Sequence, residues 1–189
     1  MKDDTKTFCD AVRQRSQENR NAMNRIGPGR ATLSPAMSIL RQELDSMVRV
    51  IWLLSVQDKE ERERLIQSTL TGQKWTVTTG NGKPRKITDR EMVELAQRLQ
   101  GWTLSVYKFG CAFIHLSDFH NHAVQDPFRR LPEAERQDIL GHMRNYHCGP
   151  LGDDPDMEEL AHFLPQVFEK IAGNLDCYLK SLEEGKTTE

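Results

Sequence analysis

The sequence predicts an all-α protein: an antiparallel bundle of four to six helices with a small hairpin-like or irregular insertion near residues 71–87. Apolar residues recur every three or four positions in several long segments, which is the period of a buried helix face. Capping residues precede these segments, and strand-like alternation is confined to the short insertion. A chain of 189 residues can bury one core, so we expect a single domain at 34–183, between an arm and linker at 1–33 and a tail at 184–189.

The first 33 residues are polar and rich in arginine, and their apolar stripe is thin. Gly27, Pro28 and Gly29 end whatever structure precedes them, because glycine and proline interrupt regular elements. We therefore expect a polar arm followed by a linker. Few apolar side chains are available there to offset the entropy of ordering, so removal of residues 1–30 should leave the fold intact.

The first convincing helix covers Pro35 to about Gln57, with Ser34 as its N-cap. One face carries apolar residues at helical spacing: Leu40, Leu44, Met47, Ile51 and Leu54. Glu43 lies on a stripe with apolar neighbours, so we expect its carboxylate to lie beside the core.

Two shorter helices should follow, separated by the insertion. Residues 58–70 form a charged helix with few apolar positions. The basic segment 71–87 alternates Thr and Val before a glycine-rich turn, which favours a small hairpin. Thr88 and Glu91 then form a capping box, which starts a helix that runs through Leu99.

The segment from Trp102 to Leu116 is apolar almost all round, so we expect this helix at the centre of the bundle. Another helix should cover residues 132–147. The last helix begins after Asp156, has a long apolar face, and should kink or restart at Pro165.

Composition and charge exclude several classes of protein. No apolar run reaches the roughly 18 residues of a membrane span, and the N-terminus lacks the apolar core of a secretory leader. The four scattered cysteines form no CxxC pair, so we expect reduced thiols and a cytoplasmic location. Residues 150–189 carry three Lys or Arg against ten Asp or Glu, whereas residues 1–149 carry 23 against 18. This imbalance is typical of solvated faces and of complementary contacts between the two ends, not of a strong nucleic-acid footprint.

A cluster near the end of the apolar helix has the residue types of a metal site. Four residues at spacings of four, three and four share one helix face: Cys111, His115, Asp118 and His122. One straight helix cannot surround a metal ion, and Glu43 could complete the site if the first helix packs there. The alternative is that His115 and His120 are core histidines with hydrogen-bond partners inside the bundle.

A second cluster lies in the helix at 132–147. Asp138 and His142 share a face, as do Arg144 and His147. A carboxylate beside a histidine raises its pKa and orients its ring, as general acid–base catalysis needs. The alternative is that Arg and His simply suit the negative end of a helix. The common nucleotide-binding and hydrolase motifs are absent from the sequence.

The early LRQELDSMVRVIWLL helix and the later YKFGCAFIHLSDFHNH segment together resemble HEPN-like helical-bundle proteins. The resemblance rests on Arg41 and Glu43 in the first segment and on His115 and Ser117 in the second. It implies an all-α bundle that often dimerises, and several such families are RNases or components of toxin and phage-defence systems. It implies a binding pocket formed by Arg41, Glu43, His115, Ser117 and His120. The nuclease branch carries an Arg and a His separated by four to six residues, and Arg136 and His142 match this pattern with five residues between them.

Three hypotheses of function follow. The first is a HEPN-like regulatory or binding bundle that acts on RNA or a partner protein in stress or phage defence, and that forms a homodimer. If it cleaves RNA, the catalytic residues would be Arg136, His142, Arg144 and His147. The second is an interaction scaffold without chemistry. The third is a metal-dependent enzyme; only this one requires a cofactor, a divalent metal.

Overall fold

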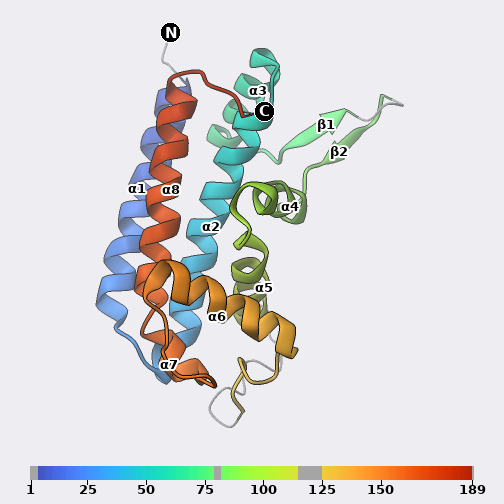
Figure 1. Ribbon diagram of the computed structural model, residues 1–189. Coiled ribbons are helices and arrows are strands. Elements are labelled where there is room, and N and C mark those ends of the chain that lie inside the picture. The colour runs from blue at the N-terminus through green and yellow to red at the C-terminus, as the bar shows by residue number, and fades with distance from the viewer. Residues whose placement is uncertain (1–3, 79–81, 115–124, 189) are drawn as a thin grey trace.

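The structure is a computed structural model that describes residues 4–78, 82–114 and 125–188. Three long helices lie side by side (Figure 1): α1 (Asp4–Ile26), α2 (Leu33–Ser55) and α8 (Leu164–Glu183). Within these ranges, strand is confined to one two-stranded sheet. The predicted all-α bundle with a small hairpin insertion is therefore confirmed.

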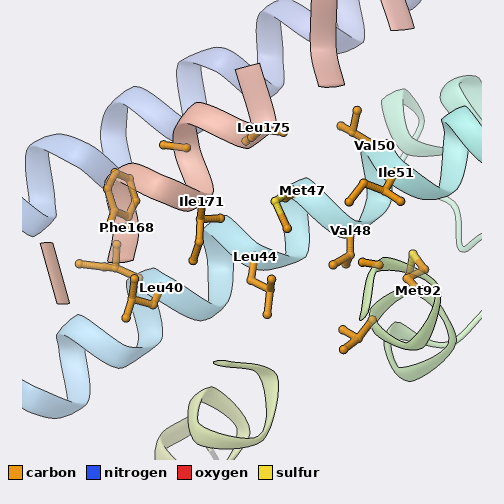
Figure 2. Close-up of a cluster of buried hydrophobic side chains, with 14 of the residues drawn as sticks. Leu40, Leu44, Met47, Val48, Val50, Ile51, Met92, Phe168, Ile171 and Leu175 are labelled. Carbon is orange, nitrogen blue, oxygen red and sulfur yellow. The ribbon is translucent and has the colours of Figure 1, made fainter. Parts of the chain in front are cut away.

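The centre of the bundle is α2, which packs against α1, α4, α5 and α8. Figure 2 shows Phe168 and Ile171 of α8 pointing toward α2, and Val48 of α2 lying toward Met92 of α4. The prediction that the segment from Trp102 to Leu116 forms the central helix is wrong. Its helical part, α5 (Thr103–Ile114), is half-buried over much of its length, because it covers one side of α2 only.

The helix α2 begins two residues earlier than predicted and ends at Ser55. Thr32 occupies the N-cap position, after a short 3-10 helix, η1 (Arg30–Thr32). The Thr32 hydroxyl donates to the carbonyl oxygens of Gly27 and Gly29, at 2.9 and 3.0 Å. Ser34, the predicted cap, lies inside the first turn because Thr32 already closes the preceding loop.

The predicted N-terminal arm is wrong for residues 4–26, which form the packed helix α1. Phe8, Cys9 and Met23 are buried in the common core. The exposed side of α1 pairs with the acidic last helix: Arg13 donates to both carboxylate oxygens of Glu183 at 2.7 Å. The charges of α1 thus meet complementary charges on α8, beside the apolar contacts that hold α1 in the core.

The charged helix α3 (Lys59–Leu70) is capped by Asp58, and the hairpin follows it. Its strands, β1 (Thr76–Thr78) and β2 (Pro84–Lys86), are antiparallel and project from the bundle (Figure 1). Trp75 anchors the base of the hairpin: its side chain is buried and its indole N–H donates to Thr69 Oγ1 at 2.8 Å.

The capping box of Thr88 and Glu91 is present at the start of α4 (Asp89–Gln100). This helix ends at Gly101, whose φ of 74° reverses the chain direction before α5 begins. Glycine adopts this left-handed conformation without the strain that a side chain would cause. The break between α4 and α5 therefore falls between the two predicted helical segments, after Leu99 and beside Trp102.

Two helices lie toward one end of the bundle, α6 (Glu133–His147) and α7 (Met157–Ala161), whereas α8 runs alongside α1 and α2. Helix α6 lies across the bundle at a steep angle to α8 (Figure 1). Pro165 falls in the first turn of α8. A new helix therefore starts there, which is one of the two predicted outcomes, a kink or a restart. Within the described ranges, none of the helices has the length and hydropathy that crossing a membrane requires.

Candidate functional site

The structure contains a cavity of about 330 Å³ where α6 and α7 lie against α2, α5 and α8. Its walls are mainly apolar and come from elements far apart in the sequence. They include Leu40, Val106, Phe109, Phe128, Leu160 and Leu164. The cavity is partly open to solvent, so a small molecule can reach it.

The wall formed by α5 depends on a close approach between two helices. A Cβ atom at Gly110 would lie 2.7 Å from Arg41 Cβ and 2.9 Å from Arg41 Cδ. Real Cβ atoms do not approach this closely, so only glycine lets α5 pack so tightly on α2. Glycine therefore sets the position of the helix that carries Val106 and Phe109 into the cavity.

The opposite wall is α6, which is tied to α5 at its N-terminal end by the ion pair of Lys108 Nζ with Glu135 Oε1, at 3.6 Å. At its C-terminal end, Cys148 has a φ of 51° and its N–H donates to the carbonyl oxygen of Met143. The Gly149 N–H donates to the same oxygen at 3.0 Å. These contacts fix the last turn of α6, which presents His147 to the cavity.

Polar side chains gather on one side of the cavity, from α6 and α8. The rings of His142 and Tyr146 are stacked, with centroids 6.1 Å apart and an interplanar angle of 20°. Lys170 of α8 places its Nζ 5.5 Å from the Tyr146 ring centroid. His147 lines the cavity beside this cluster. We call His142, Tyr146, His147 and Lys170 the polar rim.

Burial lowers the pKa of His147 below its ordinary value, and electrostatic interactions with Lys170 and with His142 lower it further. His147 is therefore a neutral imidazole near pH 7, with one nitrogen free to donate and the other to accept. The Nε2 atom of His142 lies 3.6 Å from Asp138 Oδ1, one turn earlier on α6. The expected proximity of Asp138 and His142 is thus present.

The predicted catalytic residues divide into two pairs. His142 and His147 both line the cavity, whereas the two arginines are engaged elsewhere. Arg136 pairs with Glu133 and Asp154. Arg144 donates to the carbonyl oxygens of Pro150 and Gly152, at 3.0 and 2.7 Å, and so holds the loop after α6.

The predicted pocket residues of α2 face different partners. Glu43 is fully buried and accepts hydrogen bonds from Ser16 Oγ at 2.5 Å and from Asn19 Nδ2 at 2.9 Å, both on α1. Arg41 lies over the Tyr107 ring of α5, at 4.5 Å from its centroid, and pairs with Asp89 of α4 at 3.4 Å. The two side chains therefore point to different sides of α2.

Several predicted site residues lie outside the described ranges: His115, Ser117, Asp118, His120 and His122. Cys111, the remaining predicted metal ligand, is half-buried on α5. In the part of the chain that the structure describes, no three His, Cys, Asp or Glu side chains converge on a common metal position. The metal site, and the binding pocket that would contain both Glu43 and His115, stay predictions.

Sequence reasoning missed Lys170 and Tyr146 of the polar rim. Lys170 follows Val167 by three residues and precedes Ile171, so it borders the apolar face of α8. That position was the only signal of its role in the sequence. Tyr146 gave no signal, because its place beside the cavity depends on how α6 crosses the bundle.

Comparison with protein-family models, curated proteins and solved structures finds no match to this chain. The cavity and its polar rim are therefore the observations on which a functional assignment rests.

Proposed function

We propose that this protein is a binding bundle for a small, largely apolar molecule, which it holds in the cavity between α5, α6 and α8. The observation that carries this proposal is the combination of apolar walls with polar side chains gathered on one side. Small-molecule sites typically have volumes of about 300–1,000 Å³ and combine apolar walls with a few orienting polar groups. The volume of 330 Å³ falls at the lower end of that range.

The size of the cavity limits the ligand. At about 30 Å³ of liquid volume per water molecule, the cavity corresponds to about eleven waters. This volume favours a ligand of roughly ten to fifteen non-hydrogen atoms. Burial of such a ligand against the apolar walls would supply most of the affinity, at about 25 cal/mol per Å² of apolar surface removed from water.

This proposal is one form of a regulatory or binding role. Action on RNA, on a protein partner, or as a HEPN-like homodimer stays a separate hypothesis. Neither predicted arginine extends into the cavity, since both hold neighbouring carboxylate or carbonyl oxygens. Of the four predicted catalytic residues, only the two histidines line the cavity. This arrangement favours the binding of a small molecule over contact with an RNA phosphate at this site.

The test is a screen of apolar compounds of about ten to fifteen non-hydrogen atoms by thermal unfolding, with neutral, anionic and cationic compounds all included. A ligand at a hundred times its Kd adds about 2.7 kcal/mol to the stability of the folded state. For a chain of this size, that increment raises Tm by about 5–11 °C.

A cavity-filling variant provides the specificity control. Ser105 lines the cavity from α5, so Ser105→Phe should place a ring in the ligand's position and abolish the Tm shift. The matched control is Leu151→Phe, at a position that is 97% exposed and outside the cavity lining. Binding that survives Ser105→Phe, or the absence of any Tm shift across the screen, contradicts the proposal.

A further inference from the structure

We infer that the ligand of this cavity is an amphipathic anion, whose apolar body fills the cavity and whose carboxylate lies at the polar rim, against Lys170 and His147. This inference rests on the proposed binding function and adds the chemical class of the ligand. A medium-chain carboxylate, with an alkyl chain and one carboxylate, has the required shape.

The charges that line the cavity carry the inference. Lys170 brings a positive charge, and His142 and His147 can each accept a proton. None of the described side chains that line the cavity is acidic. A cationic ligand would therefore meet only like or neutral groups there, whereas an anionic ligand meets charge of the opposite sign.

Lys170 is available to a ligand. It lies on the exposed side of α8 beside Tyr146, and no carboxylate among the described residues lies within ion-pair distance of its Nζ. Other cations of this helix and of α1 differ in this respect: Lys180 pairs with Asp176 at 2.7 Å, and Arg20 pairs with Glu169 at 2.8 Å. Lys170 is thus placed at the cavity without a counter-charge from its own helix.

His147 adds a hydrogen-bond donor to the same site. Burial, and then Lys170 and His142, lower the pKa of His147, so its neutral ring offers an N–H at the rim where Lys170 brings the positive charge. Asp138 Oδ1 lies 3.6 Å from His142 Nε2, but its side chain is mainly exposed and does not line the cavity. A bound carboxylate would supply the missing negative charge and accept hydrogen bonds from the ammonium group and an imidazole N–H.

The experiment compares three probes with the same eight-carbon chain: sodium octanoate, 1-octanol and octylammonium chloride. Isothermal titration calorimetry on the full chain measures each Kd. We expect octanoate to bind most tightly and octylammonium most weakly. Lys170→Met keeps the apolar stem of the side chain and removes its charge, so it should weaken octanoate binding by about three- to tenfold. The same variant should leave 1-octanol binding unchanged.

Two further measurements separate a contact with Lys170 from a general charge effect. Lys180→Met removes one positive charge from the same helix, away from the cavity, and should leave the Kd of octanoate unchanged. Binding of octanoate should also raise the pKa of His147, measured by NMR titration, because a nearby negative charge favours the imidazolium form. 1-Octanol should not raise it.

The outcomes distinguish the two proposals. If none of the three probes binds, the proposed binding function fails and this inference fails with it. If 1-octanol or octylammonium binds as tightly as octanoate, the binding function stands and the anionic class is overturned. If octanoate binds most tightly but Lys170→Met and Lys180→Met have equal effects, Lys170 is not the headgroup contact and the inference is overturned. Binding of a second copy of this chain at the cavity, detected as a dimer that octanoate does not dissociate, also overturns it.

Discussion

The packing of α5 on α2 gives a sharp test, because one alanine substitution should destabilise the protein while the same change elsewhere should stabilise it. At Gly110, a Cβ would lie 2.7, 2.9 and 3.0 Å from the Cβ, Cδ and Cγ atoms of Arg41. The Arg41 Cβ is fixed to the backbone of α2, so a rotamer change cannot remove the closest contact. Gly110→Ala must therefore push the two helices apart or distort one of them.

The control is Gly173→Ala, in the middle of α8, where an added Cβ would meet no atom within 4 Å. Both substitutions gain helix propensity of about 1 kcal/mol, since alanine is the better helix former. This gain cancels when the two variants are compared. What remains is the cost of overpacking, typically about 1–3 kcal/mol. We expect Gly173→Ala to raise the free energy of unfolding and Gly110→Ala to lie below it by that amount.

Urea denaturation, followed by far-UV circular dichroism and extrapolated to water, measures both free energies of unfolding. The difference corresponds to about 2–12 °C in Tm for a chain of this length. Displacement of α5 should also weaken ligand binding, since Val106 and Phe109 line the cavity. Equal stabilisation by the two substitutions would refute the close approach of α5 to α2.

Three further outcomes can be tested. Ser16→Ala should lower the free energy of unfolding by about 1–3 kcal/mol, because a buried oxygen of Glu43 loses its donor, and by less in a Glu43→Gln background, where the carboxyl group that accepts this hydrogen bond is replaced; a double-mutant cycle in urea with zero coupling would contradict the buried contact. Removal of residues 1–26 should abolish cooperative thermal unfolding, because α1 buries apolar side chains in the common core; an unchanged Tm would restore the interpretation of a dispensable arm. His147 has a lowered pKa in the folded state, so the unfolded chain takes up its proton first as pH falls through about 6.5. Stability should therefore decline from pH 7 to pH 5, and the decline should be smaller in His147→Gln; identical pH profiles of Tm would argue against burial of this imidazole.

The helices that carry strong local signals were predictable from the sequence. The capping box of Thr88 and Glu91 is made within one turn, so its geometry needs no tertiary contact. The hairpin after Trp75 and the start of a new helix at Pro165 likewise follow from short-range backbone preferences.

The misassignments arose where a helix depends on its partner. Helix α1 has a thin apolar stripe and many charges. Considered without the rest of the chain, this pattern favours a polar arm. In the folded chain, its arginines meet the carboxylates of α8, and Ser16 and Asn19 satisfy the buried Glu43. Glu43 was correctly placed beside the core, but its partners lie more than twenty residues away on the segment that was expected to be an arm.

The sequence by itself determined that this chain forms helices, where most of them start and end, and that Glu43 lies among apolar neighbours. Periodicity and capping act over a few residues, so one chain segment contains all the information they need. Only the tertiary structure decided that α2 is central, that Arg41 and Glu43 face different helices, and that His142, His147 and Lys170 border one cavity. The cavity exists because α6 crosses helices that come from distant parts of the chain, and that crossing is set by packing among them all rather than by any local pattern.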